Sequence, residues 1–279
     1  MTTLDDILSS HRTRRPVVMG ILNVTPDSFS DGGRFFDSAA AVEHARLLVR
    51  EGADVLDVGA ESTRPGSGGV GPDEQIRRLA GVLPAVVDLG RPVSIDTTSA
   101  AVAAFALDAG AVIVNDVSAG RADHDLLPLA ADRGAAVVLM HMLGTPRDMQ
   151  IDPRYDDVVA EVREFLARRM DAAVAAGVPA GRIILDPGIG FGKTLEHNLA
   201  LLAGTGRLVS LGRPVLVGPS RKRFLGALTG QDQPEQRVVA TAAACLAAWA
   251  RGASVFRVHD VSALVQALAV WRAVDGVAG

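Results

Sequence analysis

The feature that most constrains the fold is a degenerate repeat of apolar runs, which places eight similar units along the 279 residues. Most units begin with Gly-Ala or Gly-Arg, continue as a run rich in Val and Ile, and end in a polar residue. The units begin at Pro16, Gly52, Gly90, Gly110, Gly134, Gly181, Gly212 and Gly252. Continuously apolar runs are typical of parallel strands buried on both faces, and a glycine before each run is typical of a helix end.

Amphipathic stretches lie between the apolar runs and predict helices. They cover residues 38–50, 73–87, 99–108, 155–176 and 236–251. Eight strand–helix units favour a closed (β/α)8 TIM barrel over an open doubly wound sheet, which would have fewer strands and an early G-x-G-x-x-G turn. We therefore predict an α/β protein in which residues 16–279 form a single-domain barrel and residues 1–15 form an N-terminal extension.

Composition and charge argue against several classes of partner. The formal net charge is −4 and the two signs are interspersed, so neither nucleic acid nor a membrane is expected as a partner. The longest apolar stretch, 238–250, is shorter than a membrane span, so no membrane insertion is expected. The N-terminal residues include Asp5 and Asp6 rather than the basic residues of an export signal, so export is not expected either. The single cysteine, Cys245, is expected to be a buried, inert thiol in a reducing cytoplasm. A small molecule is the expected partner.

The polar residues that end the apolar runs are the candidate functional residues, because a barrel carries its site at the carboxyl ends of its strands. They are Asn23, Asp57, Asp96, Asn115, His141, Asp186, Ser220, Arg257 and His259. Each alone is most simply a hydrogen-bonded rim residue, but together they predict a ring of donors and acceptors around a ligand. The carboxylate and amide edges of Asp96, Asn115 and Asp186 suit a flat nitrogen heterocycle. Paired zinc ligands and a nucleophile elbow are both missing.

Basic residues at the other side of the mouth predict a phosphate site. Ser220 and Lys222 follow the seventh run, and Arg257 ends the eighth, where barrels often bind phosphate. Thr63 and Arg64 after the second run add a hydroxyl and a second guanidinium, which indicates a polyphosphate. The chain has 26 arginines and two lysines, Lys193 and Lys222. Lys222 is a candidate ligand contact, whereas Lys193 receives no role.

Several longer motifs make the chain resemble the dihydropteroate synthase family. They are NVTPDSFSDGG at 23–33, DVGAESTRPG at 57–66, SIDT, VNDVS, VLMHM, DPGIGFGK at 186–193, GPSRKRF and FRVHD. The resemblance runs from about residue 17 to the eighth run. It implies the same barrel and a transferase of folate synthesis, which joins a dihydropterin hydroxymethyl diphosphate to p-aminobenzoate and releases pyrophosphate. It also implies a Mg²⁺ ion and a homodimer formed through outer helices.

The resemblance assigns roles to individual residues. The pterin contacts are Asp96, Asn115, Asp186 and Lys222, with Met140 and Phe191 as apolar walls; the Mg²⁺ ligand is Asn23, together with diphosphate oxygens; the diphosphate contacts are Thr63, Arg64, Arg257 and His259; the aminobenzoate surroundings are Phe29, Pro65, Ser220 and Lys222. The expected catalytic residues are Arg64, Asp96, Lys222, Arg257 and His259.

The expected mechanism is a dissociative displacement. The aniline amine needs no deprotonation before attack, so the difficult event is the departure of pyrophosphate, which Mg²⁺ and the basic residues would stabilise. Glycines at 32–33 and within 66–71 predict first and second loops flexible enough to close over the site. One residue departs from the family pattern: Ala60 stands where a second glycine is expected, so a positive φ would be strained there.

Two other functions compete with this interpretation. A methyltetrahydrofolate:corrinoid methyltransferase has a similar barrel and pterin pocket but binds no diphosphate, so Arg64, Arg257 and the long first loop speak against it. A non-catalytic pterin-binding paralogue is expected to have lost at least one of four residues, all of which are present: Asn23, Thr63, Arg64 and Lys222.

Overall fold

The computed structural model describes residues 2–25, 38–61, 69–145 and 148–277. Four predicted site residues, Phe29, Thr63, Arg64 and Pro65, lie outside these ranges, as do most of the two glycine-containing loops. The roles predicted for them therefore stay predictions.

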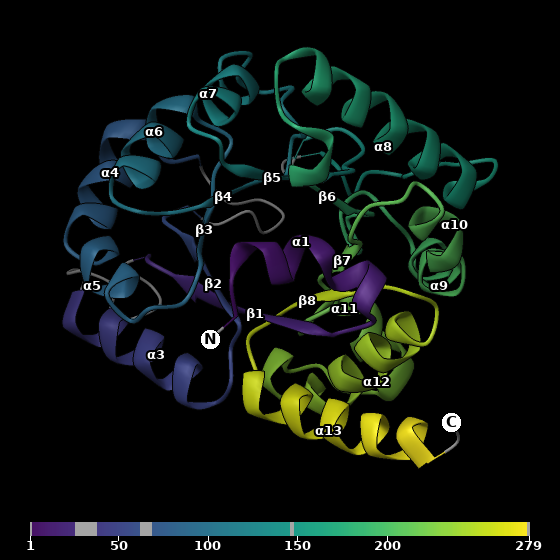
Figure 1. Cartoon of the computed structure of the whole chain (residues 1–279). Helices are drawn as coiled ribbons and strands as arrows, with labels where there is room; N and C mark the ends of the chain where they lie inside the picture. The colour runs from purple at the N-terminus through teal and green to yellow at the C-terminus, as the bar shows by residue number, and fades with distance from the viewer. Residues whose placement is uncertain (1, 26–37, 62–68, 146–147, 278–279) are drawn as a thin grey trace.

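Eight parallel strands form the centre of the molecule (Figure 1). They are β1 (Val17–Asn23), β2 (Val55–Gly59), β3 (Val93–Asp96), β4 (Ile113–Asp116), β5 (Ala136–Met140), β6 (Ile183–Asp186), β7 (Leu216–Val217) and β8 (Val255–Val258). Their order is β6-β5-β4-β3-β2-β1-β8-β7, and a parallel bridge between Leu185 and Val215 joins the two ends of this sheet. The predicted (β/α)8 barrel is confirmed.

Helices surround the barrel. They are α3 (Ser38–Arg50), α4 (Pro72–Ala80), α5 (Leu83–Val87), α6 (Ala100–Asp108), α7 (Leu126–Asp132), α8 (Val158–Ala175), α9 (Leu195–Ala203), α10 (Thr205–Val209), α11 (Arg223–Thr229), α12 (Val238–Trp249) and α13 (Val261–Val277), with 3-10 turns at η1 (Ala180–Arg182) and η2 (Pro234–Arg237). The prediction of one helix over 73–87 is wrong, because two helices, α4 and α5, occupy it. Pro84 explains the break, since its ring would clash with the carbonyl of Ala80 in a continuous helix.

Glycines end most of the helices before the strands, as the repeat predicts. The φ values of these glycines run from 61° at Gly134 to 109° at Gly110, a region that favours residues without a Cβ. The sixth unit differs, because Gly181 lies within η1 and Gly177, with φ 98°, follows α8 instead.

The N-terminal segment closes the amino-terminal end of the barrel, a role that the sequence analysis did not assign to it. Residues Leu4–Thr13 form α1, which lies across the centre of the ring in Figure 1. Ile7 is fully buried in a cluster with Val17 and other residues near the strand starts. The hydroxyl of Ser10 donates to that of Ser254 at 2.9 Å, just before β8.

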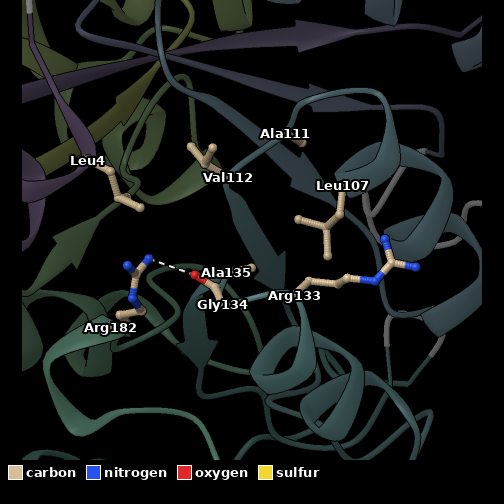
Figure 2. Close-up of a pocket in the computed structure, with 8 residues that line it drawn as sticks. All are labelled: Leu4, Leu107, Ala111, Val112, Arg133, Gly134, Ala135 and Arg182. Atoms are coloured by element: carbon tan, nitrogen blue, oxygen red, sulfur yellow. Dashed lines mark hydrogen bonds between the residues drawn. The ribbon is translucent and has the colours of Figure 1, made fainter.

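A small cleft also lies at this amino-terminal end (Figure 2). Its volume is about 160 Å³, and its lining residues are Leu4, Leu107, Ala111, Val112, Arg133, Gly134, Ala135 and Arg182. The Arg182 guanidinium donates to the Gly134 carbonyl at 2.6 Å across it. Because the cleft adjoins α1 and the starts of β4 and β5, it is separate from the carboxyl ends of the strands.

Alternation along the strands divides the core into two parts. In β1, Val17 and Met19 belong to the inner cluster that contains Ile7, whereas Val18 and Leu22 belong to the larger cluster between strands and helices. The same period of two continues in the other strands, as expected for a pleated backbone. Among the described residues, no helix combines the length and the apolar character that a membrane crossing requires.

Candidate active site

The predicted site residues share the inward parity of their strands. Every second side chain of a strand lies on the same face. In five strands, the residues of the inner cluster are Val17, Val55, Ile113, Ile184 and Val255. The residues an even number of positions further along these strands therefore also point inward, and they are Asn23, Asp57, Asn115, Asp186 and Arg257. Parallel pairing places Asp96 opposite Asn115, and Met140 opposite Asp186. The structure therefore brings these side chains together at the carboxyl end of the barrel.

A buried ion-pair network lies at the centre of this group. Arg257 Nε donates to Asp57 Oδ2 at 2.6 Å, and its Nη2 donates to Asp96 Oδ2 at 2.7 Å. Asp57 is fully buried and also accepts from the Asn115 amide at 3.1 Å. Burial raises the pKa of Asp96 to about 7, although the charge of Arg257 opposes the shift. Arg257, predicted as a diphosphate contact, is thus held by two carboxylates of the barrel interior.

Asp57 has a structural role that the sequence pattern alone does not reveal. It belongs to the predicted ring, but the sequence predicts no role for it. The signal in the sequence is a carboxylate between Leu56 and Val58, where a buried charge requires a partner. The structure supplies that partner in Arg257, which is 200 residues away in the chain.

Asp186 ends β6 and begins the segment that shapes the pocket. Its Oδ1 accepts from the Gly188 backbone N–H at 2.6 Å, and burial raises its pKa. Gly188 has φ 66°, and a Cβ there would lie 1.9 Å from the carbonyl oxygen of His141. No other residue fits, so the DPG turn brings the backbone directly against the end of β5.

Lys222 and two apolar residues complete this side of the site. Lys222 Nζ donates to the Ile189 carbonyl and lies 4.0 Å from the centre of the Phe191 ring. Phe191 packs against a buried cluster of Val117, Met140, Met142 and Met149. Burial lowers the pKa of Lys222 to about 7, against the opposing charge of Asp186. The predicted pterin contacts and apolar walls are therefore neighbours in the structure.

Ser220 and His259 meet on the side of β7 and β8. Ser220 Oγ lies 3.0 Å from His259 Nδ1 and accepts from the His259 backbone N–H at 3.1 Å. Arg221, which the sequence analysis did not assign, braces this corner through two hydrogen bonds to Asp260 at 3.0 and 2.6 Å. The strands β7 and β8 are thereby tied together at the edge of the site.

Ala60 does not distort the second loop at its start. It is buried, and it is not among the residues with positive φ in the described part of the chain. The family glycine is therefore not required for backbone conformation at this position.

Comparison with known proteins agrees with this geometry. A model of the family described as pterin binding enzyme matches residues 19–259. A dihydropteroate synthase from Synechocystis sp. is 46% identical over 264 residues, covering 93% of this chain and 91% of the relative. The chain belongs to the dihydropteroate synthase family.

Solved structures of the dihydropteroate synthase family share the fold. A Xanthomonas albilineans dihydropteroate synthase with 4-aminobenzoic acid is 52% identical, with a TM-score of 0.88 and coverage of 94% of this chain and 93% of that one. The same organism's enzyme in complex with 7,8-dihydropteroate is 49% identical, with a TM-score of 0.85 and 94% coverage of both chains.

Proposed function

We propose that this enzyme joins (7,8-dihydropterin-6-yl)methyl diphosphate to 4-aminobenzoate, forming 7,8-dihydropteroate and pyrophosphate. Membership of the family makes the chain a transferase of folate synthesis. The observation that carries the proposed substrates is the inward group of Asp96, Asn115 and Asp186, with Lys222 beside it. Carboxylate and amide edges can pair with the ring N–H groups of a pterin. The related Xanthomonas enzyme with 4-aminobenzoic acid supports the second substrate.

In the proposed reaction, the C–O bond to the diphosphate breaks before the C–N bond forms. Arg257 and His259 would stabilise the negative charge that accumulates on the departing diphosphate. The positive charge on the exocyclic carbon spreads into the pterin ring. Asp96 is already paired with Arg257, so Asp186 would contribute more to stabilising this cation. The neutral aniline nitrogen then attacks, and its surplus proton leaves to solvent.

We further propose that Mg²⁺ takes part, with Asn23 as its protein ligand. Among the described residues, no group of three or more His, Cys, Asp or Glu side chains could hold a metal ion by itself. Asn23 offers one neutral amide oxygen, which fits an ion that is held mainly by diphosphate oxygens. When bound, the ion would neutralise charge on the leaving group.

The magnesium proposal has a test that does not depend on turnover. Calorimetric titration of Mg²⁺ should show weak binding to the free protein and much tighter binding once pyrophosphate is present. Asn23→Ala should reduce the second affinity but not the first. Tight Mg²⁺ binding without pyrophosphate would contradict the proposal.

A coupled assay of pyrophosphate release tests the function itself. With the pterin diphosphate and Mg²⁺, release should be slow without 4-aminobenzoate and fast with it. A methyltransferase-like enzyme or a binding paralogue would release no pyrophosphate in either case. Formation of dihydropteroate, followed by mass spectrometry, checks that the two substrates are joined.

We also propose that the enzyme is a homodimer and that it works in the cytoplasm. An apolar groove of about 380 Å³ runs between α9, α11 and α12. Leu228, which lines the groove, is 51% exposed, and Val239 on α12 is 82% exposed. A second copy of the chain would cover such a face, as the family resemblance implies. The single buried cysteine, Cys245, is consistent with a reducing compartment.

A further inference from the structure

Lys193 is a buried amine for which the proposed reaction has no direct use, and burial lowers its pKa to about 7. It is 4% exposed and lies between β6 and α9. Its Nζ is 2.8 Å from the Phe191 carbonyl, 3.0 Å from His141 Nδ1 and 3.5 Å from the His141 carbonyl. An ammonium group has three N–H donors and no acceptor, so these three acceptors match it.

We infer that Lys193 is a positioning residue for the pterin pocket, acting through the ring of His141 and the backbone of Phe191. This inference rests on the proposed function, because it concerns the same pocket. Lys193 belongs to the motif DPGIGFGK, which begins with the proposed pterin contact Asp186. Lys193 would hold the far end of that segment as Asp186 holds its beginning.

The contact with His141 fixes the protonation pattern of the imidazole. The ring is buried and meets Phe165 edge-on, with centroids 4.8 Å apart. Burial, together with the charges of Lys193 and Arg121, lowers the pKa of His141 to about 3, so the ring is neutral at pH 7. When the Lys193 ammonium donates to Nδ1, the ring proton must lie on Nε2.

The contact with Phe191 connects Lys193 to the pocket wall. The Phe191 side chain packs against the cluster that contains Met140, and its ring lies under the amine of Lys222, so a shift of its backbone would move both contacts. A second, uncharged anchor holds the same segment, because the Tyr155 hydroxyl donates to the Gly192 carbonyl at 2.9 Å. Tyr155→Phe is therefore a matched control, because it removes one hydrogen bond to this segment and keeps the Lys193 amine.

The first test measures pterin affinity by calorimetry with 6-hydroxymethylpterin as the ligand. Lys193→Met should weaken binding about tenfold or more, as expected for the loss of a hydrogen bond to a charged group. In turnover, KM for the pterin substrate should rise more than kcat falls. Tyr155→Phe should change affinity less than about threefold, on the scale of one neutral hydrogen bond. Lys193→Gln, which keeps one donor group, should recover part of the affinity.

The second test examines the imidazole of His141 directly by nitrogen NMR of the substrate-free protein, with the signal assigned by its loss in His141→Gln. Wild type should show a single tautomer with the proton on Nε2, and folded Lys193→Met should show a mixture. Wild-type pterin affinity in Lys193→Met, or an unchanged tautomer signal, would overturn the inference. If wild type neither binds the pterin nor releases pyrophosphate, the proposed function fails instead, since the NMR signal needs no substrate.

Discussion

At the scale of single residues, Arg257 shows how a barrel interior tolerates a cation. Its guanidinium donates to Asp57 and Asp96, and Asp57 accepts from Asn115 as well. A buried charge without partners is costly, and the two carboxyl groups offset that cost for Arg257, while the Asn115 amide donates to Asp57. The same network holds Asp96 and Asn115 in the positions where a pterin would meet them.

Asp186→Asn should weaken pterin binding by about 2–5 kcal/mol, the cost of truncating one partner of a buried charged pair. The new amide N–H₂ would face the ring donors in place of an acceptor oxygen. Calorimetry with a pterin ligand measures the effect. Asp157→Asn makes the same change at the exposed N-cap of α8 and should leave affinity as in wild type. Equal affinities in wild type, Asp186→Asn and Asp157→Asn would show that Asp186 does not contact the pterin.

Asp96→Asn should change the stability of the substrate-free enzyme in a pH-dependent way. The folded protein holds a proton on Asp96 up to about pH 7, whereas the unfolded chain releases it near 3.8. This group therefore contributes stability at low pH that is lost as the pH rises through 7. The free energy of unfolding of the variant, minus that of wild type, should therefore rise from pH 5 to pH 7 and then level off. Urea unfolding at four pH values checks this, and a constant difference would show that the pKa of Asp96 is not raised.

At the scale of elements, α1 is the least expected part of the structure. Its sequence is mostly polar, yet Ile7 enters the inner cluster at the starts of the strands. The helix is fixed at its N-terminus by a capping box between Thr3 and Asp6. The segment that resembled an extension is therefore a lid on the amino-terminal mouth.

Ile7→Ala should lower the free energy of unfolding by about 2–5 kcal/mol, because it leaves a cavity in the inner cluster. Activity at room temperature should survive, since the carboxyl end of the barrel is untouched. Ser9→Ala, a partly exposed position on the same helix, is the control and should cost less than about 0.5 kcal/mol. Urea unfolding distinguishes the two; an equally small loss in both would mean that α1 does not close the barrel.

At the scale of the whole molecule, the two ends of the barrel differ in character. The amino-terminal end is covered by α1, and the carboxyl end gathers the charged and amide side chains. The amino-terminal end, with α1 and the strand starts, can therefore stabilise the fold, while the carboxyl end carries the chemistry. The apolar groove of α9, α11 and α12 lies on the outer helices, and so belongs to neither end.

Leu228→Arg should weaken the proposed homodimer, because it places a charge beside this groove. Sedimentation velocity across a concentration series should show a dimer for wild type and a shift to monomer for the variant. Val174→Arg, at a 46% exposed position on α8, is the matched control and should remain dimeric. A monomeric wild type at micromolar concentration would reject the proposal.

The sequence by itself determined the strands, their number and the positions of Asp96, Asn115 and Asp186 at the ends of apolar runs. These properties are local, because the apolar runs, the glycines before them and the polar residues that end them are readable within each unit. Only the tertiary structure decided which side chains point into the barrel and which partners meet. Asp57 finds Arg257 because closure of the sheet places β8 next to β1, and Lys193 finds His141 because the β6–α9 segment folds back over the end of β5. The closing of the amino-terminal mouth by α1 was decided in the same way. Such contacts depend on strand register and barrel closure, which join residues far apart in the chain and leave no local pattern.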